Sequence, residues 1–170
     1  MKISSSILAI SMTLMVGCSS SYHKDLDSAL DDSKKLAALS GLITNEIQQT
    51  WHTAIFDHEY SRNGKTEYVS DFNEAIQTLL DEPEIKSVNK SIDSLNLTLK
   101  TKMGKIVDPP SKYKESYEDM VQVYSSVSEL SNLAKSPTGS LQSFKQNVDG
   151  LAGVIISKIK AIEIRNPQNN

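Results

Sequence analysis

Residues 85–106, IKSVNKSIDSLNLTLKTKMGKI, carry the most regular apolar spacing in the chain. The steps along one face alternate between three and four residues: Ile85, Val88, Ile92, Leu95, Leu99, Lys102/Met103 and Ile106. Because residues three and four apart share one face of an α-helix, this spacing predicts a helix with a narrow apolar stripe of the coiled-coil type. Such a stripe needs other helices to pack against, so the segment favours an all-α fold.

Helical spacing continues on the N-terminal side of this segment. We expect a first helix over residues 24–61, with Gly64 ending it in the left-handed conformation. Thr66 can cap a second helix, which Asp81-Glu82-Pro83-Glu84 interrupts. Pro83 suits the first turn of the next helix, because a residue in that turn needs no backbone N–H partner.

Two further helices are expected on the C-terminal side. Ser111 or Asp108 can cap the first of them, and residues 136–140, SPTGS, mark the loop before the second. Gly150 and Gly153 fall inside that last helix. They either let a neighbouring helix approach closely, which we favour, or break the helix near Gly150.

Nothing in the chain shows strand-like alternation of useful length, and the connections between the expected helices are short. Short connections favour antiparallel neighbours. The sequence therefore predicts an all-α fold, an antiparallel helical bundle of four to five helices with coiled-coil-like seams. The bundle domain is expected over residues 24–166, followed by a tail at 167–170.

Residues 1–17, MKISSSILAISMTLMVG, have the layout of a secretory signal peptide. Lys2 is followed by an apolar run that ends in a small residue, Gly17. The run from Ile3 to Val16 covers 14 residues, whereas a span of the bilayer needs about 20. We therefore expect residues 1–17 to be removed rather than to cross a membrane.

The stretch Met15-Val16-Gly17-Cys18 resembles the lipobox of bacterial lipoproteins, although Met15 replaces the usual leucine. The resemblance implies cleavage before Cys18, a diacylglyceryl group on its sulfur and acylation of the new amino terminus. Cys18 is the single cysteine of the chain, which fits an attachment point and excludes an internal disulfide. Residues 18–23 would then be a lipidated cysteine with a polar tether.

Residues 108–144, DPPSKYKESYEDMVQVYSSVSELSNLAKSPTGSLQSF, are similar to small lipoproteins of unknown function from Gram-positive bacteria and their prophages. The resemblance rests on the Pro-Pro start, the spaced tyrosines and the Pro-Thr-Gly-Ser turn. These are structural features, so it implies no activity.

The charge of the mature chain excludes a basic nucleic-acid-binding face. Without residues 1–17 the chain has 17 basic and 21 acidic side chains, a net charge of −4, and no polybasic cluster. The lipid is the expected link to the membrane. Ser19, which follows the cysteine, is not an acidic retention residue, and this implies the outer membrane if the cell is Gram-negative.

We expect no enzyme, cofactor or metal site. The three histidines are His23, His52 and His58, and the six-residue step between the last two does not place them on one helical face. Neither a nucleophile motif nor a Gly-rich phosphate loop is present. The weaker alternative is a metal site with His52, Asp57, His58 or Glu59 as possible ligands.

One cluster, residues 51–60, WHTAIFDHEY, gathers the only Trp with two other aromatic residues and two histidines. Its aromatic side chains fall on two faces of the expected helix, which is more than one core seam uses. The cluster is either covered by neighbouring helices or forms a partner-binding patch, because aromatic anchors dominate binding energies. The candidate residues are Trp51, His52, Phe56, His58 and Tyr60.

We therefore expect a lipid-anchored, extracytoplasmic bundle that binds a protein partner at the cell envelope, with the sharper version that it blocks an incoming phage or bacteriocin. One alternative is a small-ligand or metal-binding lipoprotein that feeds a transporter through the residue 51–60 cluster. A second alternative is a coiled-coil spacer, since self-association would suit the stripe at 85–106.

Overall fold

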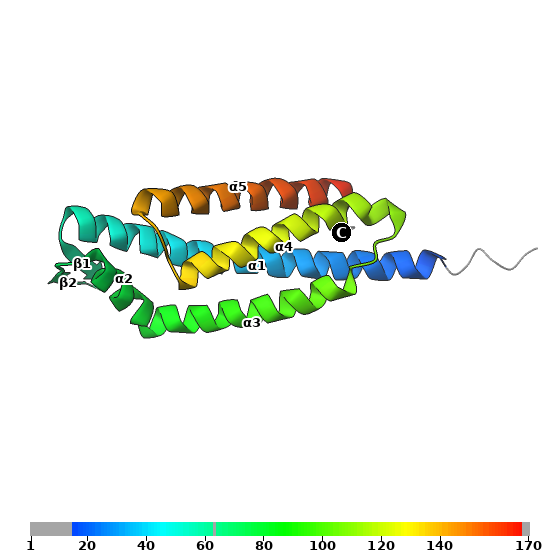
Figure 1. Ribbon diagram of the computed structural model, residues 1–170. Helices are drawn as coiled ribbons and strands as arrows, with labels where there is room; N and C mark the ends of the chain where they lie inside the picture. Colours follow the sequence, from blue (N-terminus) through cyan, green and yellow to red (C-terminus); the bar gives the residue numbers. More distant parts are fainter. Residues whose placement is uncertain (1–14, 63, 168–170) are drawn as a thin grey trace, which may run out of the picture.

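The computed structural model describes residues 15–62 and 64–167, with the backbone alone for residues 15–20 and 65. Four long helices lie side by side in an antiparallel bundle (Figure 1). They are α1 (Met15–Phe56), α3 (Pro83–Lys105), α4 (Lys114–Lys135) and α5 (Leu141–Arg165). α1 and α4 run in one direction and α3 and α5 in the other (Figure 1). The predicted all-α antiparallel bundle is confirmed.

α1 is the organising helix, because it contacts α2, α3, α4 and α5. Its 42 residues give it a length of about 63 Å at the usual helical rise. Its inward face is fully buried at residues spaced three, four or seven apart, including Leu26, Leu36, Ile43 and Ile47. Burial of this apolar face stabilises α1 in the bundle.

The stripe at 85–106 forms the seam of α3 as its spacing predicts. Ile85, Ile92, Leu99 and Ile106 are buried, and the alternate stripe positions are half-buried. Leu97, which lies off the stripe, is 69% exposed. The alternation of three and four steps therefore identifies which face of α3 packs on α1 and α4.

A two-stranded hairpin follows α1, and the expectation that this helix continues to Ser61 is wrong. Strands β1 (Glu59–Arg62) and β2 (Lys65–Tyr68) pair antiparallel, with Arg62 opposite Lys65. The two residues between them, Asn63-Gly64, are the sequence most favoured by tight hairpin turns. Gly64 has the expected positive φ, +76°, but it serves the hairpin and not a helix end.

The helix starts follow the expected signals in part. α2 (Phe72–Asp81) is capped by Asp71, whose carboxylate accepts from the Asn73 N–H at 2.8 Å, and not by Thr66. Pro83 stands in the first turn of α3 as predicted. A 3₁₀ turn, η1 (Ser111–Tyr113), precedes α4. Ser140 caps α5 through a reciprocal pair with Ser143, which confirms the start signal in the preceding loop.

The glycines of α5 neither break the helix nor admit a close neighbour. α5 runs without interruption through Gly150 and Gly153. A Cβ atom built at either position meets nothing within 4 Å. The close packing that we favoured from the sequence is therefore wrong, and both glycines face open space on the outside of the bundle.

The start of α1 differs from the expected tether. The helix begins at Met15, and Tyr22 is buried, with its hydroxyl donating to the Ile106 carbonyl at 2.9 Å. Its ring packs on Tyr113 at a centroid distance of 5.0 Å. The polar composition of residues 18–23 was misleading, because the single aromatic side chain of Tyr22 is enough to hold this turn of α1 against the bundle. The predicted signal peptide up to Leu14, and the tail beyond Pro167, lie outside the described residues.

Buried carboxylates join the helices through ion pairs. Asp119 of α4, 6% exposed, accepts from Lys158 of α5 at 2.8 Å and from Arg165 of the same helix. Burial opposes ionisation of Asp119, but these two bonds outweigh it and hold its pKa below the usual value. The two ion pairs thus hold α5 against α4.

Candidate binding surface at the hairpin end

The predicted cluster at 51–60 splits between the core and the surface, because α1 ends at Phe56. Trp51 is 4% exposed and packs edge to face on Phe144 of α5, with 5.5 Å between ring centroids. It also contacts Phe72, the first residue of α2, at 5.9 Å. Trp51 is therefore a core residue that joins three helices, not part of a binding surface.

Tyr60 lies in β1 and is also buried. Its hydroxyl donates to the carboxylate of Glu82, the residue between α2 and α3. Burial, and then the bond to Glu82, raise the pKa of Tyr60 well above its usual range. Arg62 completes this contact, because it pairs with Glu82 and donates to Glu46 of α1 at 2.8 Å. Tyr60 thus fastens the hairpin to the bundle.

The remaining candidates, His52, Phe56 and His58, are exposed, and a further ring accompanies them. Phe56 is 64% exposed and lies against the His52 ring at 4.6 Å. Tyr68 of β2 is 79% exposed and lies 6.4 Å from the His58 ring. We call His52, Phe56, His58 and Tyr68 the aromatic patch.

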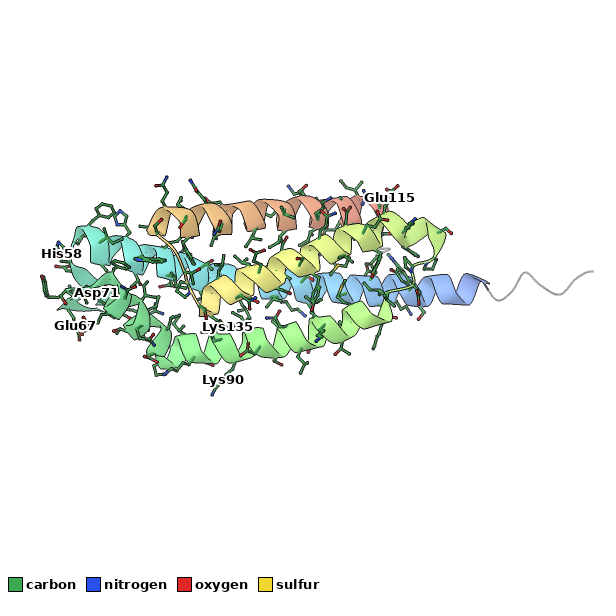
Figure 2. The ribbon with its side chains drawn as sticks, viewed as in Figure 1. His58, Glu67, Asp71, Lys90, Glu115 and Lys135 are labelled. Atoms are coloured by element: carbon green, nitrogen blue, oxygen red, sulfur yellow. The ribbon has the colours of Figure 1, made fainter. Side chains whose placement is uncertain are left out.

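The hairpin joins these two ring pairs at one end of the bundle. His58 has a φ of +58°, which reverses the chain between α1 and β1, and its carbonyl accepts from the Val69 N–H at 2.9 Å. Figures 1 and 2 show the hairpin, α2 and His58 at the end of the bundle opposite the start of α1. We call this region, residues 52–84, the hairpin end. The sequence pattern missed Tyr68, since its role depends on the hairpin register that sets it opposite Glu59.

The hairpin end is strongly acidic. Residues 57–84 hold eight acidic and two basic side chains, a net charge of −6, whereas the whole chain has −3. The rest of the chain therefore carries +3. Among the described residues, no cation lies within 4.0 Å of five exposed carboxylates there. These are Asp57, Glu59, Glu67, Glu74 and Glu84.

Two hollows on the hairpin end share Thr78 and Glu82. One, of about 320 Å³, lies between the hairpin and α3 and includes Glu67 and Glu84. The other, of about 470 Å³, opens along α2. Three carboxylates line each hollow, and Arg62 also lines the first. This side of the hairpin end is therefore also negative.

His52 and His58 lie against different aromatic rings. His52 contacts Phe56 and His58 contacts Tyr68, and these contacts turn the two rings toward different partners. Within residues 15–62 and 64–167, no group of three or more His, Cys, Asp or Glu side chains is close enough to hold an ion. His52 instead borders a groove of about 440 Å³ between α1 and α5, together with amide side chains and Lys145.

Cys18, the expected lipid attachment residue, lies in the first turn of α1, and the structure describes its backbone only. From Cys18 to Phe56 the helix is continuous, which separates the two residues by about 57 Å. None of the helices in the described part of the chain has the length and apolar character that crossing a membrane requires.

Comparisons with known proteins give no relative. No protein family, no curated protein and no solved structure matches the chain.

Proposed function

We propose that the protein is a bacterial lipoprotein that presents the hairpin end to a protein partner at the cell envelope. Residues 1–17 would be removed, and Cys18 would carry the lipid at the start of α1. Two acyl chains give stable anchoring, whereas one gives only reversible binding. The observation that carries the proposal is the exposure of Phe56 and Tyr68, the last residues of α1 and β2, because Figure 1 shows these element ends opposite the start of α1.

The geometry of α1 supports this arrangement. Three residues separate Cys18 from the buried Tyr22, so a lipid on Cys18 would hold the bundle close to the bilayer with little slack. The aromatic patch would then lie up to about 57 Å from the anchored end of α1. Exposed aromatic side chains are costly to leave in water and are enriched in interfaces, which favours a binding role for this end.

The sharper version of the proposal is that the bundle blocks an incoming agent, a phage or a bacteriocin. A small anchored protein with its binding surface held away from the membrane suits interception outside the cell. Deleting the gene and measuring sensitivity to phages and bacteriocins tests this version. Unchanged sensitivity across both groups of agents would remove it and would leave the broader binding role standing.

Intact mass spectrometry of the protein extracted from its native membrane tests the anchor. The proposal predicts a species that begins at Cys18 and carries acyl mass, and the loss of that species in Cys18→Ser. An unmodified chain that retains residues 1–17 would contradict the lipoprotein assignment and with it the location at the envelope.

A further inference from the structure

The aromatic patch is bordered by carboxylates for which no partner cation is found among the described side chains. Asp57 lies between Phe56 and His58 in the chain, and Glu59 stands directly opposite Tyr68 in the hairpin. Both carboxylates are exposed, and no cation of the described residues lies within 4.0 Å of either. Residues directly opposite in an antiparallel pair have neighbouring side chains. Tyr68 and Glu59 thus lie side by side across the hairpin, and Asp57 directly follows the exposed Phe56.

Exposed rings beside free carboxylates suit one kind of ligand group. A guanidinium or ammonium group is attracted to the face of an aromatic ring and forms ion pairs with carboxylates. Arginine suits both better than lysine, because its planar group stacks on a ring while its N–H groups bind an oxygen pair. We propose that the hairpin end docks a basic, arginine-containing protein segment, with arginine side chains stacked on Tyr68 and Phe56 and paired with Glu59 and Asp57.

The charge of the hairpin end argues against other occupants. A second copy docking through the same end would bring −6 against −6, and an anionic lipid surface or a nucleic acid would be repelled for the same reason. A neutral apolar partner would cover the carboxylates without pairing them, which is unfavourable. The inference deepens the proposed binding function and rests on it for the setting in which the partner is met.

The test measures binding of defined cationic peptides to the protein purified from its native membrane in a neutral detergent. The probes are fluorescent nona-arginine and nona-lysine, with a Gly-Ser peptide of the same length as the neutral control. Fluorescence anisotropy gives Kd at low and at physiological ionic strength. We expect both cationic peptides to bind, nona-arginine more tightly by several-fold, and the neutral peptide not to bind.

Paired variants separate the rings from the charges. Phe56→Leu with Tyr68→Leu keeps apolar bulk and removes the ring faces. Asp57→Asn with Glu59→Gln keeps size and removes charge. The matched controls lie away from the hairpin end: Leu97→Ala with Ile164→Ala, which are 69% and 80% exposed, and Glu118→Gln with Glu129→Gln on α4. All of these side chains are exposed, so circular dichroism should show unchanged folding.

The ring variant should weaken nona-arginine binding about tenfold, because each exposed cation–π contact contributes about threefold. The charge variant should weaken it about fivefold and reduce its dependence on salt. The controls should change Kd by less than about twofold. The inference is overturned if neither cationic peptide binds, if the ring variant binds as the parent does, or if the controls weaken binding as much.

The same preparations separate this inference from the proposed function. Their intact mass shows whether Cys18 is acylated, independently of any peptide. An acylated protein that binds no cationic peptide would retain the anchored binding role and lose the basic partner. A protein without acylation that binds nona-arginine through Tyr68 and Phe56 would lose the anchor and keep the docking surface.

Discussion

Removing the Tyr22 hydroxyl should destabilise the bundle, although the sequence around Tyr22 predicts a polar tether. In Tyr22→Phe the Ile106 carbonyl loses the donor that lies 2.9 Å away, and Ile106 is fully buried. A buried acceptor left without a partner costs about 1–2 kcal/mol. Tyr22→Ala also removes the ring that packs on Tyr113, so its expected loss is about 3–5 kcal/mol.

Urea unfolding followed by circular dichroism measures both losses, with Cys18→Ser in every protein compared so that all are unlipidated. The matched control is Tyr68→Phe, because Tyr68 is 79% exposed and its change should stay within about 0.5 kcal/mol. Equal stability of Tyr22→Ala and its parent would refute the reasoning. Residues 19–23 would then be a tether after all, and the bundle would be free to move relative to its anchor.

Three further outcomes follow from buried and solvent-facing positions. Asp119→Asn should lower the free energy of unfolding at neutral pH by about 2–3 kcal/mol. Because the pKa of Asp119 is depressed in the folded protein, the parent should lose this contribution as the pH falls below about 4. Urea titrations across that pH range compare the two proteins. Gly150→Ala and Gly153→Ala should each raise stability by about 1 kcal/mol, because a Cβ meets nothing within 4 Å in a helix interior; a loss measured by thermal melting would mean that a neighbour covers this face. Burial, followed by the fields of two neighbouring tyrosines, raises the pKa of Tyr22 to about 12. The free energy of unfolding should therefore fall as the pH rises from 10 to 12, and it should fall less in Tyr22→Phe. An equal loss in both proteins would argue against this pKa shift.

The helices could be predicted because each carries its own periodic face. Ile85, Ile92 and Leu99 repeat at seven-residue intervals and are all buried in α3. Ser140 and Pro83 supply start signals that depend on the backbone of one helical turn alone. Such local signals do not need knowledge of the neighbours, so the bundle followed from the sequence.

The hairpin could not be predicted with the same rules. Four-residue strands are too short to show alternation, and the left-handed glycine that ends a helix also serves a tight turn. The positive φ at Gly64 fits both structures. The predicted helix end placed Tyr60 on a second face of the first helix, whereas pairing with β2 turns its side chain toward Glu82.

The candidate site was predicted only in part, because the exposure of its side chains depends on contacts with other elements. Exposure of His52 and Phe56 depends on which sides of α1 its neighbours cover, and Trp51 is buried because Phe144 and Phe72 reach it from α5 and α2. These contacts join residues far apart in the chain. Periodicity identifies an apolar face but does not say how many helices cover it.

Site-specific photocrosslinking in living cells tests the central claim most directly, that the hairpin end meets a protein partner. A photoreactive amino acid is placed at Tyr68 in one strain and at Leu97 in another, and both side chains are largely exposed. The account predicts a discrete crosslinked product from position 68, its loss when Asp57→Asn and Glu59→Gln are added, and no such product from position 97. Equal products from both positions, or none from position 68, would contradict it.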